Sequence, residues 1–169
     1  YLAVQRVARA VEHDDVLEYW KSAPYLLNFM EEYELKRKLD RNLTGKQSES
    51  FLTAMQQASQ GLLNRKEITK YRAIDPANAR LRSLIHDTVD RGAWKLLWIP
   101  PSLPYYPPKA PFADPELQSF TKRLVFSCWR VVPKAIAALA SYEAERRMML
   151  SYRKDIRNTN GARKKRRPL

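Results

Sequence analysis

Cysteine is nearly absent from this chain of 169 residues, which contains Cys128 alone. A single cysteine cannot form an internal disulfide, so we expect a reducing compartment and a cytoplasmic protein. Long apolar runs are also missing. No run approaches the roughly 20 residues of a membrane-spanning helix, and the first fifteen residues are interrupted by Arg6 and Arg9, unlike the apolar centre of a secretory signal. We therefore expect neither a membrane partner nor export.

Catalytic and metal-binding patterns are missing too. The two histidines, His13 and His86, do not join a Cys/His cluster with zinc spacing, and no G-x-S-x-G motif occurs. Gly45 and Lys46 do not make a phosphate-binding loop, because the upstream glycine is absent and Gln47 replaces the hydroxyl residue that such a loop requires. We therefore expect no catalytic residue, no metal ligand and no cofactor within this chain.

Positive charge, by contrast, is abundant and is concentrated near the carboxyl end. The net charge is +13, and from Arg146 onward ten basic residues face one acid, Asp155, so that this segment carries +9 and the first 145 residues carry +4. A basic cluster attracts nucleic-acid phosphates by releasing counterions. A solvated surface, or a nuclear import signal at ARKKRRPL, residues 162–169, is the alternative interpretation.

The hydrophobic pattern predicts a helical region over residues 1–92. Apolar residues recur at helical intervals over residues 2–11, 22–39, 51–63 and 77–91, and Gly92 stands where a left-handed cap ends a helix. Polar segments at residues 41–50 and 64–79 are predicted to be a loop and a connection. Aromatic residues gather near the second helical segment and serve either as core or as a stacking surface; they are Tyr19, Trp20, Tyr25, Phe29 and Tyr33.

A proline-rich segment follows over residues 93–119. It opens with a candidate buried strand, WKLLWI at residues 94–99, and then contains seven prolines between Pro100 and Pro115. Because proline is excluded from the interiors of helices and sheets, this part is predicted to be an extended, polyproline-like crossing. We interpret it as a semi-rigid strap, and a ligand for a proline-recognising domain is the alternative.

The most informative stretch is KRLVFSCWRVVPKAIAALA, residues 122–140. Leu124, Val125 and Phe126 form a short apolar run that is typical of a buried strand, and Pro133 fits the first turn of a helix that continues through good helix formers. Strand, turn and helix in this order indicate an α/β unit. The turn of such a unit lies at the carboxyl end of its strand, and the helix start attracts phosphate there.

These residues resemble motif IV of superfamily 2 helicases and Swi/Snf-type ATPases, which opens the second RecA-like lobe. The motif is carried by Leu124, Val125, Phe126, Ser127 and Trp129, and the match covers roughly twenty residues. Two further stretches, VLEYWKSAPYLLNFM and AWKLLWIPPSLPYY, are similar to the region that joins the two lobes. The chain begins with Tyr1 and not with Met, and we expect a piece of a longer protein.

The resemblance implies a mainly α fold with a small α/β part. Residues 1–92 would be the helical inter-lobe region, residues 93–119 the strap, residues 120–157 the first strand and helix of the RecA-like lobe, and residues 158–169 a basic tail. The parent would be an ATP-dependent helicase or translocase. Its ATP and Mg²⁺ would bind outside this chain, which would supply nucleic-acid contacts and lobe coupling without catalysis.

The expected partners are nucleic acid, DNA before RNA, and the remaining lobes of the parent. The nucleic-acid contacts are predicted at two places, the turn before the long helix and the basic tail. The predicted contact residues are Ser127, Trp129, Arg130, Lys134, Arg163, Lys164, Lys165, Arg166 and Arg167. The alternative function is a stand-alone basic helical module that binds nucleic acid or a protein partner. The predicted strand over residues 124–126 distinguishes the two functions, because a motor lobe requires this strand to be paired within a parallel sheet, whereas a helical module does not.

Overall fold

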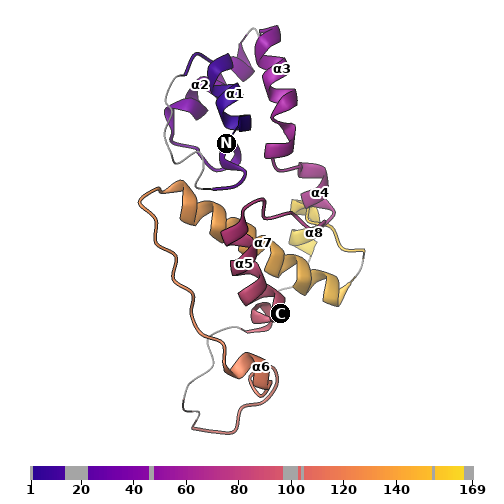
Figure 1. Cartoon of the computed structure of the whole chain (residues 1–169). Helices are drawn as coiled ribbons and strands as arrows, with labels where there is room; N and C mark the ends of the chain where they lie inside the picture. Colours follow the sequence, from indigo (N-terminus) through magenta and orange to yellow (C-terminus); the bar gives the residue numbers. More distant parts are fainter. Residues whose placement is uncertain are drawn as a thin grey trace. The chain divides into compact units, whose positions relative to one another are not determined.

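The computed structural model describes residues 2–13, 23–45, 48–96, 103, 105–153 and 155–165. Every regular element within these ranges is a helix or a helical turn (Figure 1). The chain divides into two compact units. Unit 1 comprises Tyr1–Asn64 with Ser127–Ile136, and unit 2 comprises Arg65–Phe126 with Ala137–Leu169.

Short helices make up most of the described part of unit 1. They are α1 (Leu2–Ala10), α2 (Glu34–Thr44) and α3 (Glu49–Gln57), with 3-10 turns at Leu26–Asn28 and Ser59–Gly61. The start of α3 is fixed by Ser48, whose hydroxyl accepts a hydrogen bond from the Phe51 N–H at 3.2 Å. This is the usual N-cap arrangement, in which a short polar side chain satisfies an N–H that the helix leaves unbonded.

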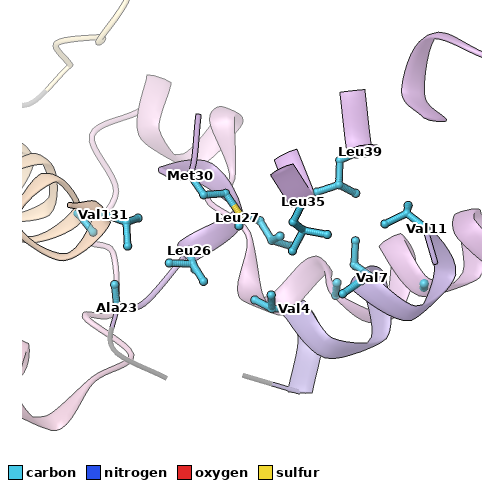
Figure 2. Close-up of a cluster of buried hydrophobic side chains, with 14 of the residues drawn as sticks. Val4, Val7, Val11, Ala23, Leu26, Leu27, Met30, Leu35, Leu39 and Val131 are labelled. Carbon is cyan, nitrogen blue, oxygen red and sulfur yellow. The ribbon is translucent and has the colours of Figure 1, made fainter. Parts of the chain in front are cut away.

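A single apolar cluster forms the core of unit 1. Apolar residues spaced three or four apart on α1 and α2 bring one face of each helix into this cluster. Figure 2 shows Val4, Val7, Leu26, Met30, Leu35, Leu39 and Val131 in this cluster. Phe51 of α3 is a further member of the cluster. Phe29 and Tyr33 pack against it, which agrees with the core interpretation of the aromatic residues, while Tyr19 and Trp20 lie outside the described residues.

The described residues of unit 2 form short helices and most of a long one. The short helices are α4 (Arg65–Thr69), α5 (Ala79–Ile85), α6 (Pro115–Gln118) and α8 (Asn160–Lys165). The long helix is α7 (Val131–Tyr152), and its first residues belong to unit 1. A π-helical turn, His86–Asp90, extends α5, and a 3-10 turn covers Ala93–Lys95. Gly92 has a φ of 95°, so the predicted left-handed cap is confirmed at this position.

The predicted α/β part is wrong. Residues 121–127 form no strand, and the side chains of Leu124 and Phe126 are 76% and 88% exposed. Within the described part of the chain, no backbone hydrogen bond holds Lys122–Phe126. A strand exists only where a neighbouring strand takes up its N–H and C=O groups. The other candidate strand, WKLLWI at residues 94–99, starts within the 3-10 turn Ala93–Lys95, and its residues 97–99 are outside the described ranges.

Other helix boundaries differ from the sequence pattern. A helix was expected over residues 22–39. Residues 23–33 instead contain a 3-10 turn, which follows Tyr25 in the left-handed conformation, and the α-helix begins only at Glu34. Its end at Thr44 lies inside the segment predicted to be a loop, and α4 lies inside the predicted connection. Among the described residues, no helix is long and apolar enough to cross a membrane.

Candidate nucleic-acid interface

The motif-like residues at the start of α7 belong to unit 1. Ser127 is exposed, and its hydroxyl accepts a hydrogen bond from the Trp129 N–H at 3.1 Å, which closes a tight turn before the helix. Trp129 is half-buried against the apolar cluster of unit 1. The hydroxyl of Ser127 faces solvent, whereas the indole of Trp129 serves packing.

The two predicted cations of this region are paired with acids. The Arg130 guanidinium donates to Glu32 at 2.8 Å, and the Lys134 ammonium donates to Glu31 at 2.5 Å. Both pairs are exposed, so each contributes little to stability. Their effect on binding is larger, since each acid cancels the positive charge that a phosphate would meet.

The basic tail belongs to unit 2 and includes a helix. Arg163, Lys164 and Lys165 are exposed on α8, where the sequence pattern placed only a basic tail. Arg166 and Arg167 lie outside the described residues. The Thr159 hydroxyl caps this helix by accepting a hydrogen bond from the Ala162 N–H at 3.1 Å.

Glu145 of α7 anchors this tail. Its carboxylate accepts a hydrogen bond from the Tyr71 hydroxyl at 2.6 Å and forms an ion pair with the Arg163 guanidinium at 3.2 Å. A second attachment joins the same segments, because the Asn158 N–H donates to the Thr69 carbonyl at the end of α4 at 2.8 Å. Three segments that are distant in the sequence thereby meet: the end of α4, the middle of α7 and the start of α8.

A basic cavity lies where these segments meet. It has a volume of about 670 Å³, and its lining includes Lys70, Arg72 and Arg157, together with the acids Glu67 and Asp155. The side chains of Lys70 and Arg72 are in no ion pair within the described residues. We use the term basic surface for the six exposed cations of this cavity and of α8, namely Lys70, Arg72, Arg157, Arg163, Lys164 and Lys165.

Sequence reasoning missed Lys70 and Arg72, although a local charge count finds them. Residues 65–72, RKEITKYR, contain four basic residues and one acid, which gives this segment a net charge of +3. Arg157 was counted in the basic carboxyl-terminal segment but was not assigned to a site. The cavity itself has no sequence signature, since it requires the fold to bring residues 67–73 against α7 and residues 155–157.

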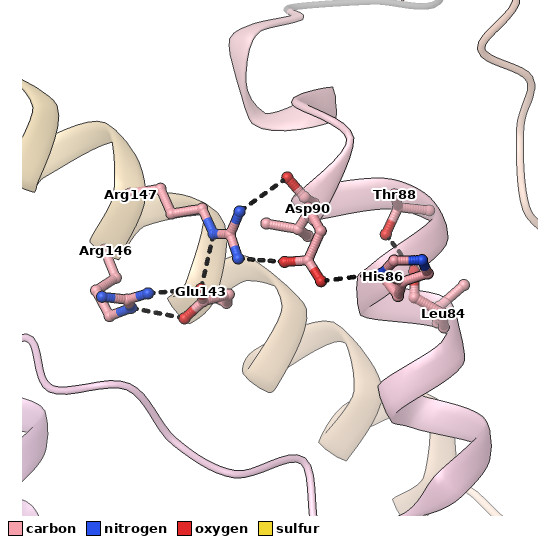
Figure 3. A network of polar contacts seen from close by, with 8 residues as sticks. Leu84, His86, Thr88, Asp90, Glu143, Arg146 and Arg147 are labelled. Carbon is pink, nitrogen blue, oxygen red and sulfur yellow. Dashed lines mark hydrogen bonds and ion pairs between the residues drawn. The ribbon is translucent and has the colours of Figure 1, made fainter.

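A network of ion pairs holds the π-helical turn His86–Asp90 to α7 (Figure 3). Glu143 and Arg147, one turn apart on α7, pair at 2.8 Å, and Arg147 also pairs with Asp90. Arg146 donates twice to Glu143, at 2.7 and 2.8 Å. His86 is exposed and contacts only Asp90 in this network, at 3.6 Å. The network fixes Arg146 between Glu143 and the cavity, so Arg146 is preorganised.

The carboxylate of Glu143 is the acid most enclosed by cations in this network. Burial raises its pKa, but the hydrogen bonds from Arg146 and Arg147 outweigh burial, and the pKa of Glu143 lies below its ordinary value of 4.5. A lowered pKa means that the ionised carboxylate stabilises the folded state above about pH 4.5. This contribution is lost as the pH falls through the folded-state pKa.

Replacing Glu143 with glutamine should therefore destabilise unit 2 at neutral pH. We expect a loss of about 1–3 kcal/mol, because the half-buried Arg146 loses its acid partner and Arg147 keeps only Asp90. The measurement is urea unfolding at pH 7 and at pH 3.5, with Glu116→Gln as the control at an exposed acid. The difference between Glu143→Gln and the unmutated chain should shrink at the lower pH. An equal difference at both values would show that the carboxylate charge is not what stabilises the fold.

Two tyrosines complete this region. Burial raises the pKa of Tyr142 to about 12, so its hydroxyl stays protonated at neutral pH and donates to the Arg72 carbonyl at 2.7 Å. The rings of Tyr142 and Tyr71 are stacked, with centroids 6.2 Å apart. Because Tyr71 is held by Glu145, both rings and the backbone of Arg72 are fixed relative to the basic cavity.

The described residues contain no group of three His, Cys, Asp or Glu side chains arranged to hold a metal ion. The arrangement instead suits an anionic ligand, held by preorganised cations and by aromatic side chains. Comparisons with protein-family models, with curated proteins and with solved structures returned no match. The functional interpretation therefore rests on the residues themselves.

Proposed function

We propose that this chain binds nucleic acid through the basic surface of unit 2 and does so as a non-catalytic part of an ATP-dependent helicase or translocase. DNA is the proposed partner before RNA. The observation that carries the binding proposal is the basic surface. Six exposed cations from two distant parts of the sequence meet around a cavity and an adjoining helix, and phosphate oxygens are the complementary ligand. Arg163 is paired with Glu145, so Lys70, Arg72, Lys164 and Lys165 are the main contributors.

Membership in a larger protein is supported by apolar side chains on the surface of unit 2. Leu103 and Tyr105 are each 90% exposed, and Leu124 and Phe126 are nearly as exposed. Large exposed apolar side chains that lie close together in sequence are typical of surfaces that another protein part covers. The remaining lobes of the parent are the partner we propose for this surface.

ATP and Mg²⁺ are assigned to those remaining lobes. The residues of this chain do not fit either group, because the sequence contains no phosphate-binding loop with its lysine and hydroxyl residue. Lobe coupling is proposed for the predicted strap over residues 93–119, which belongs to unit 2. We infer a cytoplasmic location, and the single cysteine, exposed and unpaired, supports it.

The binding proposal predicts strong dependence on salt. Three or four phosphate contacts release about two to three counterions from a single strand, so the affinity for DNA should fall about 20- to 50-fold between 50 and 200 mM NaCl. Fluorescence anisotropy of a labelled 20-nucleotide DNA measures this, and an assay of phosphate release should detect no ATP hydrolysis. An isotherm that is the same at both salt concentrations would contradict the proposal.

The second candidate function is a stand-alone basic helical module. The observation that favours it is the absence of strands among the described residues, since a motor lobe is organised around a sheet. The coding sequence on both sides of this segment discriminates between the two. A phosphate loop and an acidic Walker B motif upstream, with an arginine finger motif downstream, would support the motor, whereas their absence would leave the module.

A further inference from the structure

A second cavity adjoins the basic cavity within unit 2. It has a volume of about 720 Å³, within the range that small organic ligands occupy. Ala73 and Arg146 line both cavities, so the two share a wall. A ligand with two different parts, one in each cavity, would therefore pass directly over the Arg146 side chain.

The lining of the second cavity is largely apolar. Ile74, Pro76, Ile85 and Leu139 supply aliphatic surface, and the Tyr142 ring supplies an aromatic face. The polar groups of this lining are mostly engaged already, as Figure 3 shows for Glu143, Arg146, Arg147 and Asp90. An apolar cavity with one fixed aromatic ring suits a flat aromatic ring as ligand.

The basic cavity suits a different chemical group. The ammonium of Lys70 and the guanidinium of Arg72 are exposed at its lining, and neither has an acid partner among the described residues. Asp155, the acid on the opposite segment, is already paired with Arg153 at 3.1 Å. Glu67 is the other acid of this lining. Four cations, Lys70, Arg72, Arg146 and Arg157, outnumber the two acids, so an anion such as a phosphate would meet an excess of positive charge.

We propose that the paired cavities bind one nucleotide of a single-stranded nucleic acid, with the base in the apolar cavity and its phosphate in the basic cavity. This inference rests on the proposed function and specifies its ligand. A base within a duplex is paired and stacked, so its ring cannot enter a cavity, whereas an unpaired base offers its faces freely. The site therefore selects single strands over duplexes.

The hydrogen bonds around the cavities keep this geometry in place without the ligand. The Tyr142 hydroxyl is bonded to the Arg72 carbonyl, and the Tyr71 hydroxyl is bonded to Glu145. Arg146 is held by two bonds to Glu143. Because the ring that would stack on the base and the cation between the cavities are both fixed, binding loses little side-chain entropy.

The test fills the apolar cavity with a bulky side chain. Ser83 is exposed on α5 and lines this cavity, so Ser83→Trp should block the base while leaving the basic surface intact. The matched control is Ser59→Trp at an exposed position of unit 1. We expect the unmutated chain and the control to bind a 15-nucleotide oligo-dT about tenfold more tightly than a 15-base-pair duplex, and Ser83→Trp to lose this preference.

A second measurement uses the unmutated chain. Oligo-dT that carries one 5-iodouracil base should crosslink under ultraviolet light to Tyr142 or to residues 73–86, as mapped by mass spectrometry. Equal affinity for single strand and duplex, a preference retained by Ser83→Trp, or crosslinks confined to other residues would overturn the inference while leaving salt-sensitive binding in place. Failure to bind either nucleic acid at low salt would overturn the proposed function itself.

Discussion

Replacing Lys70, Arg72, Lys164 and Lys165 with glutamine is expected to weaken nucleic-acid binding about 100-fold at 50 mM salt. All four side chains are exposed, two at the basic cavity and two on α8. Each cation that contacts a phosphate releases about one counterion, so the slope of log affinity against log salt should become shallower by about 3–4. Anisotropy titrations at four salt concentrations measure both quantities.

The matched control removes the same charge from unit 1. Arg6, Arg9, Arg37 and Arg41 are exposed, so glutamine at these positions also lowers the net charge by four. We expect this control to lose less than about fivefold in affinity and to keep the salt slope nearly unchanged, because diffuse charge acts only at long range and is screened by salt. If both variants lost the same affinity, net charge and not the basic surface would determine binding.

The helical periodicity of the sequence predicts much of the apolar core and little of the helix geometry. Val4, Val7 and Leu35 are apolar and recur with helical spacing, and all three are buried. Local preferences fail near Tyr25, which adopts a left-handed conformation that no pattern of apolar residues indicates. Helix boundaries depend on capping contacts such as that of Ser48 with the Phe51 N–H, and these form only when the chain is folded.

The segment Leu124–Phe126 shows why a strand is difficult to predict from its own residues. Its β-branched and aromatic side chains favour an extended backbone, and the described backbone from 121 to 127 is not helical. A strand also requires hydrogen bonds from a neighbour, which a local pattern does not contain. The sequence thus predicts that these residues are extended and apolar, whereas pairing and burial depend on other residues.

The candidate site was predictable in its charge and not in its shape. The tail was identified from composition, and Arg163, Lys164 and Lys165 do lie on the basic surface. Arg130 and Lys134 were predicted from the resemblance and from the helix start, but Glu32 and Glu31 pair with them from about one hundred residues away in the sequence. Long-range ion pairs of this kind determine which cations keep an uncompensated charge, and composition cannot reveal them.

Replacing Phe51 with alanine should lower the free energy of unfolding of unit 1 by about 3–5 kcal/mol. The Phe51 side chain is fully buried in the apolar cluster, so its removal loses the burial of the ring and leaves a cavity. A loss of this size is a large part of the 5–15 kcal/mol that typically stabilises a small domain. Urea unfolding followed by circular dichroism measures it, and a shift to lower urea concentration is expected.

The neighbouring residue provides the control. Leu52 follows Phe51 on α3 but is 44% exposed, so Leu52→Ala should cost less than about 1 kcal/mol. Both variants remove a large apolar side chain from the same turn of the same helix, and the main difference between the two sites is how deeply the side chain is buried. If the two were equally destabilised, the helical preference of the residues and not the packing of α3 on the core would hold this unit together. A difference of several kcal/mol would show that the face of α3 bearing Phe51 is the one that folds inward.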